Sequence, residues 1–138
     1  IDYIKQKDAT FVTNAVAHAK KLAVSGFHVI LVGGELKGTT EAVVGNEAIL
    51  SIQNYNFTKG FFGTNGVSKR HGFTTPDPNE ALVKQEAMRQ TERCYVLADS
   101  QKFGTVSSVT FAPFDGAMIL TETEVPEGFA GSKNVRIV

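Results

Sequence analysis

The stretch FFGTNGVSKRHGFTTPDPNEALVKQ (61–85) combines the end of an apolar run, a glycine-rich connection and the start of a helix. The run that ends at Phe62 is typical of a buried strand, because the turn-forming residues 63–66 follow it at once. Asp77 fits a helix N-cap, Pro78 fits the first helical position, and Glu80 lies where a capping box places its acid. The stretch therefore predicts a strand, a loop and a helix that spans 78–93.

The same alternation continues along the rest of the chain. Apolar runs alternate with segments of helical period, which favours a βαβ fold with a mainly parallel sheet. At 138 residues and 42% apolar content, the chain fits a single globular domain, 1–138. Strands are predicted at 9–12, 28–32, 59–63, 94–98, 106–112, 118–121 and 134–138, and further helices at 14–25 and 41–55.

Composition excludes several classes of partner. Fourteen basic residues balance fourteen acidic ones without long runs of one sign, so we expect no nucleic-acid or membrane surface in these residues. A single cysteine excludes an internal disulfide and suits the cytoplasm. The three histidines have no metal-binding spacing, and we expect neither a metal nor a cofactor.

Small polar residues follow four of the predicted strands. Ligands of open parallel sheets bind beyond the carboxyl ends of the strands. Glycines let backbone N–H groups approach an anion, and helix N-termini add partial positive charge. This edge therefore predicts a small, polar, phosphorylated ligand. The residues at the four strand ends are Thr13, Asn14, Gly33, Gly34, Gly63, Thr64, Asn65, Gly66, Asp99 and Lys102.

A purely structural explanation stays open for each of these residues. Helix capping accounts for Thr13–Asn14 and for Asp99, and turn formation accounts for the glycine pair. Glu80 and Lys84 are four residues apart and form an ordinary ion pair on a helix surface. The binding hypothesis depends on their joint placement, since capping alone does not require a lysine and glycine-rich loops at one sheet edge.

Four separated motifs resemble a known family. GTNGVSKRHGFTTPDPNEALVK, YVLADSQKFG, VTNA and GGELKGTTEAVVG resemble, in place and order, segments of the effector-sensing domain of DeoR-type bacterial transcriptional repressors. The agreement covers about residues 11–121. The resemblance implies a three-layer, Rossmann-like α/β fold shared with ribose-5-phosphate isomerase, glucosamine-6-phosphate deaminase and CoA-transferases.

The resemblance also implies a function. It predicts the sensor of a carbohydrate-metabolism repressor of fructose- or lactose-operon type, a cytoplasmic homodimer or homotetramer without enzymatic activity. The effector is a phosphorylated sugar, with fructose 1-phosphate as the first candidate. Operator DNA is contacted only by a helix-turn-helix domain outside this chain. Family sensor domains begin with a helix, a strand and a D-x-G-[ST]-T loop, and we expect the domain 1–138 to lack those parts.

Carried over residue by residue, the family motifs assign ligand contacts. Thr13 and Asn14 line the floor, the glycine loops approach the sugar and its phosphate, and Lys102 is the main cationic partner. The full predicted ligand set is Thr13, Asn14, Gly33, Gly34, Lys37, Gly63, Thr64, Asn65, Gly66, Glu80, Lys84, Asp99 and Lys102.

Two other functions stay open. An isomerase or deaminase needs a proton-accepting group after the third strand, where this chain has Asn65, which cannot take a proton; Asp99, Glu80 and His71 are the remaining acid–base candidates. The second is an oligomerisation domain with a vestigial site, to which exposed apolar residues such as Phe114 and Phe129 would contribute.

Overall fold

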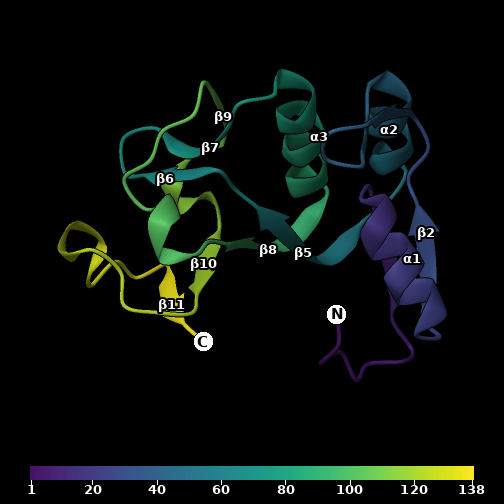
Figure 1. Ribbon diagram of the computed structural model, residues 1–138, viewed down its shortest axis with the longest axis horizontal. Coiled ribbons are helices and arrows are strands. Elements are labelled where there is room, and N and C mark those ends of the chain that lie inside the picture. Colours follow the sequence, from purple (N-terminus) through teal and green to yellow (C-terminus); the bar gives the residue numbers. More distant parts are fainter. The chain divides into compact units, whose positions relative to one another are not determined.

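The computed structural model describes residues 1–138 and divides them into two compact units, Ile1–Asn54 and Tyr55–Val138 (Figure 1). Each unit contains parallel strands and at least one helix, so the predicted Rossmann-like α/β class is confirmed. None of the helices has both the length and the apolar content that crossing a membrane requires.

The first unit begins with a strand, a helix and a strand. β1 (Thr10–Thr13) and β2 (His28–Leu31) pair in parallel, with α1 (Val16–Val24) between them in the chain. Ala19 and Leu22 form the buried face of α1. These elements confirm the predictions at 9–12, 14–25 and 28–32, with ends shifted by one or two residues.

The prediction of one helix over 41–55 is wrong in its first part. β3 (Glu35–Lys37) and β4 (Ala42–Val44) form an antiparallel hairpin, and α2 covers only Asn46–Gln53. Val43 and Val44 are buried, and β-branched residues favour strands when half of their surface packs. Gly45 separates strand from helix with a φ of 96°, a conformation that glycine adopts readily.

A four-stranded parallel sheet forms the centre of the second unit. Its strands are β11 (Val135–Ile137), β10 (Met118–Thr121), β8 (Thr91–Leu97) and β5 (Phe57–Gly63), in that order. The predicted strands at 59–63, 94–98, 118–121 and 134–138 are confirmed, with β5 and β8 extended at their amino ends.

Helix α3 (Pro78–Arg89) connects β5 to β8 and starts where the sequence predicts. The Asp77 carboxylate accepts hydrogen bonds from the backbone N–H groups of Asn79 (2.7 Å) and Glu80 (3.4 Å), which satisfies two donors of the first turn. The helix ends at Arg89 rather than 93, because Thr91 already pairs with Phe57 at the start of β8.

A second sheet in this unit is antiparallel, and most of it was not predicted. β6 (Gly66–Ser68) and β7 (Gly72–Thr75) form a hairpin within the stretch assigned to a loop, and β7 pairs with β9 (Val109–Ala112). The predicted strand at 106–112 therefore exists but belongs to this sheet. β6 has only three residues, too few to show an alternating pattern, and β7 begins four residues after it inside a polar, glycine-containing stretch.

Aromatic rings join the two sheets of the second unit into one core. Phe73, Phe103 and Phe111 are buried, and the Phe129 ring lies edge-on to Phe103 at 5.1 Å between centroids. Phe114 and Phe129 pack against this core, with their rings 6.0 Å apart. Phe114 and Phe129, which the oligomerisation alternative names as candidate contact residues, are therefore partly buried.

Gly72 lies where β7 packs closely against β9. Its φ is 74°, and a Cβ atom there would collide with the carbonyl oxygen of Ala112. We expect Gly72→Ala to lower the free energy of unfolding by about 3 kcal/mol, because it adds a steric clash to an unfavourable φ. Urea titration measures the loss.

Gly104 is the matched control, since its φ is 82° and a Cβ atom there would meet nothing within 4 Å. Gly104→Ala should cost only about 1 kcal/mol, the conformational part alone. Equal losses for the two variants would show that the contact with Ala112 contributes nothing.

Candidate functional site

Four of the five predicted ligand residues of the first unit lie at or just after the ends of two neighbouring strands, and the fifth, Lys37, belongs to the β3–β4 hairpin. Thr13 is the last residue of β1 and pairs with Leu31 of β2, and the Val32 N–H donates to the Thr13 carbonyl oxygen at 2.9 Å. Asn14 and the Gly33–Gly34 segment therefore continue from adjacent strands. Lys37 is the last residue of β3 and is half-buried.

Asn14 anchors the β3–β4 hairpin. Its Nδ2 donates to the Val43 carbonyl oxygen at 3.0 Å, and the Val43 N–H donates to the Asn14 carbonyl oxygen at 2.7 Å. The capping explanation is wrong for Asn14, because the N-cap of α1 is Ala15 and no side chain caps that helix. The Thr13 hydroxyl accepts a hydrogen bond from the Ala15 N–H at 3.1 Å and shapes the turn before it.

The two glycines of the first unit differ in what requires them. A Cβ atom on Gly34 would come 2.8 Å from the Val44 carbonyl oxygen, and its φ is 149°, so hairpin packing already requires glycine there. A Cβ atom on Gly33 would meet nothing within 4 Å. Gly33 is therefore the member of the pair that packing does not explain.

Lys84 on α3 is tied to the end of β5. Its ammonium donates to the Gly63 carbonyl oxygen at 2.7 Å and lies 4.9 Å from the centroid of the Phe111 ring. Burial lowers the pKa of the Lys84 ammonium below its ordinary value of 10.5, and the Glu80 carboxylate opposes this shift. Glu80 therefore acts on Lys84 through charge, while the hydrogen bond goes to the backbone.

The residues that follow β5 form a turn with several internal hydrogen bonds. The buried Thr64 hydroxyl lies 2.8 Å from the Gly66 carbonyl oxygen and 3.1 Å from that of Thr74. The Asn65 side-chain oxygen accepts a hydrogen bond from the Thr75 hydroxyl at 3.1 Å. A Cβ atom on Gly66 would collide with the carbonyl oxygen of Thr105, so packing requires this glycine.

Asp99 and Lys102 lie together after β8. One Asp99 carboxylate oxygen accepts from the Gln101 N–H at 3.0 Å, which confirms the capping explanation, and the other lies 3.9 Å from the Lys102 ammonium. Phe103, the next residue, is buried in the core. The Gly104 N–H donates to the Val67 carbonyl oxygen at 2.8 Å and fixes the end of this segment.

Sheet register brings the two segments of the second unit to one edge. Gly63 pairs with Leu97, so the Thr64–Gly66 turn and the Asp99–Lys102 segment leave the carboxyl ends of neighbouring strands. Lys84 reaches the same edge through its contact with Gly63. The second unit therefore places two lysines and a carboxylate at the strand ends where the sequence predicts a ligand.

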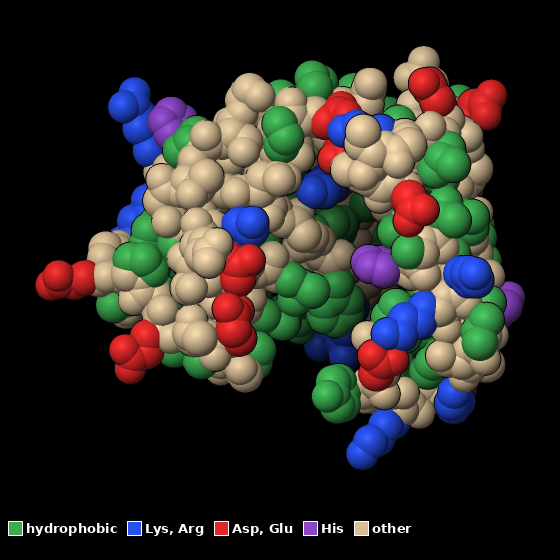
Figure 2. Space-filling view, viewed as in Figure 1, with side chains coloured by type: hydrophobic (Ala, Val, Ile, Leu, Met, Phe, Trp, Pro, Cys, Tyr) green, Lys and Arg blue, Asp and Glu red, His purple; other side chains and the backbone are tan.

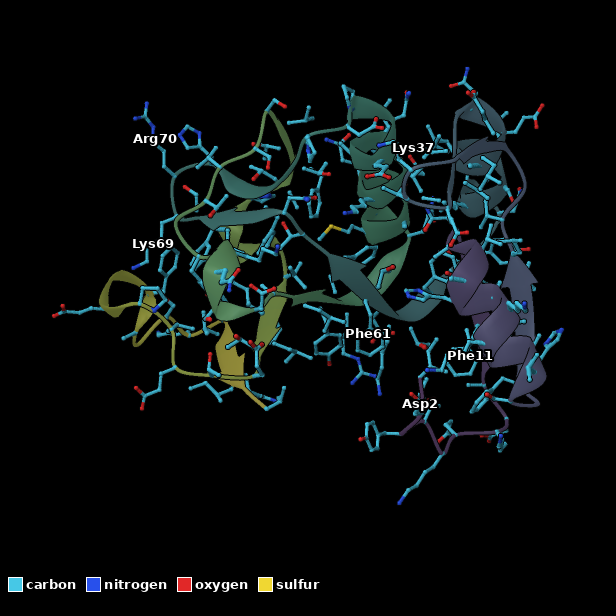
Figure 3. All side chains as sticks on the ribbon, in the orientation of Figure 1. Asp2, Phe11, Lys37, Phe61, Lys69 and Arg70 are labelled. Carbon is cyan, nitrogen blue, oxygen red and sulfur yellow. The ribbon has the colours of Figure 1, made fainter.

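A surface groove of the second unit lies elsewhere. It has a volume of about 820 Å³ and runs between the β6–β7 turn and the segment after β9. Figure 3 labels Lys69 and Arg70 on that turn, and His71 follows them at the groove. None of the predicted ligand residues lines this groove. His71 belongs to it, and not to the strand ends that carry Asp99.

Thr75 is a residue that sequence reasoning missed. Its hydroxyl fixes the orientation of the Asn65 amide, although Thr75 is not among the predicted ligand residues.

Charges are mixed on the face of each unit that Figure 2 shows, where acidic and basic side chains are interspersed. This mixture agrees with the balance of fourteen basic and fourteen acidic residues.

Comparison with known families decides the classification. The family model described as the DeoR C terminal sensor domain matches residues 1–123. The chain belongs to this family. Its motifs are thus those of a sensor domain, and the resemblance found in the sequence is confirmed.

Several similar proteins are named as transcriptional regulators. The uncharacterized HTH-type transcriptional regulator FruR of Bacillus subtilis (strain 168) is 45% identical over 122 residues, which cover 88% of this chain and 49% of FruR. IolR of the same strain, an HTH-type transcriptional regulator, is 32% identical over 79% of this chain and 44% of IolR. The lactose phosphotransferase system repressor of Staphylococcus aureus (strain NCTC 8325 / PS 47) is 33% identical over 74% of this chain and 41% of its own. The matched segments thus span less than half the length of these relatives.

The lowered pKa of Lys84 gives this sensor domain a specific pH dependence. The folded chain binds the Lys84 proton less tightly than the unfolded chain does, so the free energy of unfolding should rise with pH between the lowered pKa and 10.5. Urea titrations at increasing pH should show this rise in the wild type and a smaller one in Lys84→Met. The exposed Lys133 provides a control, and Lys133→Met should follow the wild type. Parallel profiles for all three proteins would contradict the assignment.

Proposed function

We propose that this chain is the effector-sensing domain of a transcriptional repressor of carbohydrate metabolism. It binds a phosphorylated sugar, with fructose 1-phosphate as the first candidate, and binding alters how a separate helix-turn-helix domain holds operator DNA. Support comes from the family and from relatives named FruR and lactose phosphotransferase system repressor. We further propose that 1–138 forms one effector-binding domain and acts in the cytoplasm as a homodimer or homotetramer.

One observation carries the proposed ligand class: the charged groups at the carboxyl edge of the parallel sheet in the second unit. Lys84 and Lys102 supply positive charge, and Asp99 supplies a carboxylate that accepts hydrogen bonds from sugar hydroxyls. A phosphate with hydroxyl groups complements this mixture better than an apolar molecule does. The other predicted ligand residues remain predictions: Gly63, Thr64, Asn65, Gly66 and Glu80 of this unit, and Thr13, Asn14, Gly33, Gly34 and Lys37 of the first unit.

Binding without turnover is the favoured mode. Asn65 occupies the place where the related enzymes carry an acid, and its amide oxygen already accepts a hydrogen bond from Thr75. An amide in this role recognises a hydroxyl but does not accept its proton. The relatives are named as regulators, which favours the same conclusion. A sugar-phosphate isomerase or deaminase is the alternative, with Asp99 as its candidate base.

Calorimetry on the 138-residue chain tests the ligand class. We expect binding of at least one of fructose 1-phosphate, fructose 6-phosphate, galactose 6-phosphate and ribose 5-phosphate, and none of free fructose or inorganic phosphate alone. Lys102→Met should weaken binding about 10- to 100-fold, because it removes a charge-assisted contact to the phosphate. Lys133→Met, which removes an exposed lysine outside the site, should bind as the wild type does. Equal affinities for the two variants would remove Lys102 from the site.

A turnover assay separates sensor from enzyme. The chain should leave ribose 5-phosphate and glucosamine 6-phosphate unchanged when product formation is followed by nuclear magnetic resonance. Isomerisation or deamination that disappears in Asp99→Asn would establish the enzymatic alternative instead.

A further inference from the structure

Thr121 is the exception among the buried polar side chains of the second unit. The Thr64 hydroxyl lies within hydrogen-bond distance of two carbonyl oxygens, the Thr74 hydroxyl accepts from the Ser107 N–H at 2.9 Å, and Thr75 donates to Asn65. Glu86 accepts from Arg89 at 3.0 Å and from Gln90 at 3.2 Å. The Thr121 hydroxyl alone has no hydrogen-bond partner, although the residue is only 1% exposed.

An unpaired hydroxyl in this position opposes folding. Burying a polar group without a hydrogen-bond partner destabilises the folded state, because the group gives up its hydrogen bonds to water. Valine would fill the same volume without that cost. Native proteins leave few such groups, and each one calls for a specific explanation. The Thr121 hydroxyl therefore needs an explanation that packing does not supply.

Sheet register places Thr121 at the edge that carries the candidate site. Phe62, Val96 and Ile119 form one row of buried side chains across β5, β8 and β10. Because side chains alternate between the faces of a sheet, residues two positions further along share that face. Two positions further along are Thr64 and Ala98, just after the ends of β5 and β8, and Thr121 at the end of β10; all three are buried. The Ala98 N–H donates to the Leu120 carbonyl oxygen at 3.1 Å, which keeps Ala98 beside the end of β10. Thr121 thus ends the strand beside Ala98, the residue that leads directly into Asp99.

The segment that follows Ala98 lies over this face of the sheet. Phe103 belongs to the same buried cluster as Ala98 and Ile119, and it forms a bridge with Val67. Asp99 and Lys102, the charged residues of the candidate site, belong to this segment. The segment therefore begins next to the end of β10, where Thr121 lies, because Ala98 is bonded to Leu120 and leads directly into Asp99.

We propose that Thr121 is a further binding residue of the effector site: its hydroxyl donates to an oxygen of the bound sugar phosphate once the 99–104 segment moves to admit the ligand. The inference rests on the function proposed above. The hydroxyl is kept because it gains its partner in the bound state, at a cost to the ligand-free state.

Three substitutions in the 138-residue chain test this role. The probe is the sugar phosphate, among the four used above, that binds the wild type most tightly. We expect Thr121→Val to raise the Tm of the ligand-free protein by a few degrees and to weaken binding about tenfold, and Thr121→Ser to stay within about threefold of the wild-type Kd. Thr74→Val is the matched control, because Thr74 is equally buried but paired. It should lower the Tm and leave the Kd within about threefold of the wild type.

The outcomes separate the two proposals. Wild-type affinity in Thr121→Val, with the wild type binding normally, overturns the role of Thr121 alone. A lower Tm in ligand-free Thr121→Val with an unchanged Kd also overturns it and assigns the hydroxyl to a buried water. If none of the four sugar phosphates binds the wild type, the proposed function fails and this inference fails with it.

Discussion

The parallel pairing of β5 with β8 is the constraint on which the second unit depends. It runs from Phe57 opposite Thr91 to Gly63 opposite Leu97, and a parallel pair requires a crossover between its strands. Helix α3 is part of that crossover, and its Lys84 returns to the Gly63 carbonyl oxygen at the end of the first strand. The pairing thereby fixes which loops leave the same edge. Thr64 to Gly66 and Asp99 to Lys102 become neighbours because their strands are neighbours.

Much of this arrangement was readable from the sequence, and the reasons are local. Apolar runs with turn residues after them marked the parallel strands, and Asp77 with Pro78 marked the start of α3 to the residue. The hairpins were missed because β3, β4 and β6 have only three residues each, too few to show a period. Gly45 explains the wrong prediction of a helix over 41–55. A single glycine is tolerated inside a helical pattern, but the backbone conformation of Gly45 separates β4 from α2.

The sequence predicts where the candidate site lies, but not which hydrogen bonds its residues make. The sequence locates the strand ends, so it predicts that Gly63, Asp99 and Lys102 share one edge of the sheet. Which hydrogen bonds those residues make depends on segments far along the chain. Asn65 accepts a hydrogen bond from Thr75, and Asn14 donates one to the Val43 carbonyl oxygen. The buried Thr121 hydroxyl has no hydrogen-bond partner, and the spacing of residues in the sequence cannot predict this.

The contact between Lys84 and Gly63 also bears on how this family can diversify. The lysine binds a backbone carbonyl, and a Cβ atom on residue 63 would meet nothing within 4 Å. The hydrogen bond from Lys84 thus depends on the position of the backbone at residue 63 and not on a side chain there. Evolution can exchange residue 63 and change what the loop offers to its surroundings, while helix and strand keep the same connection.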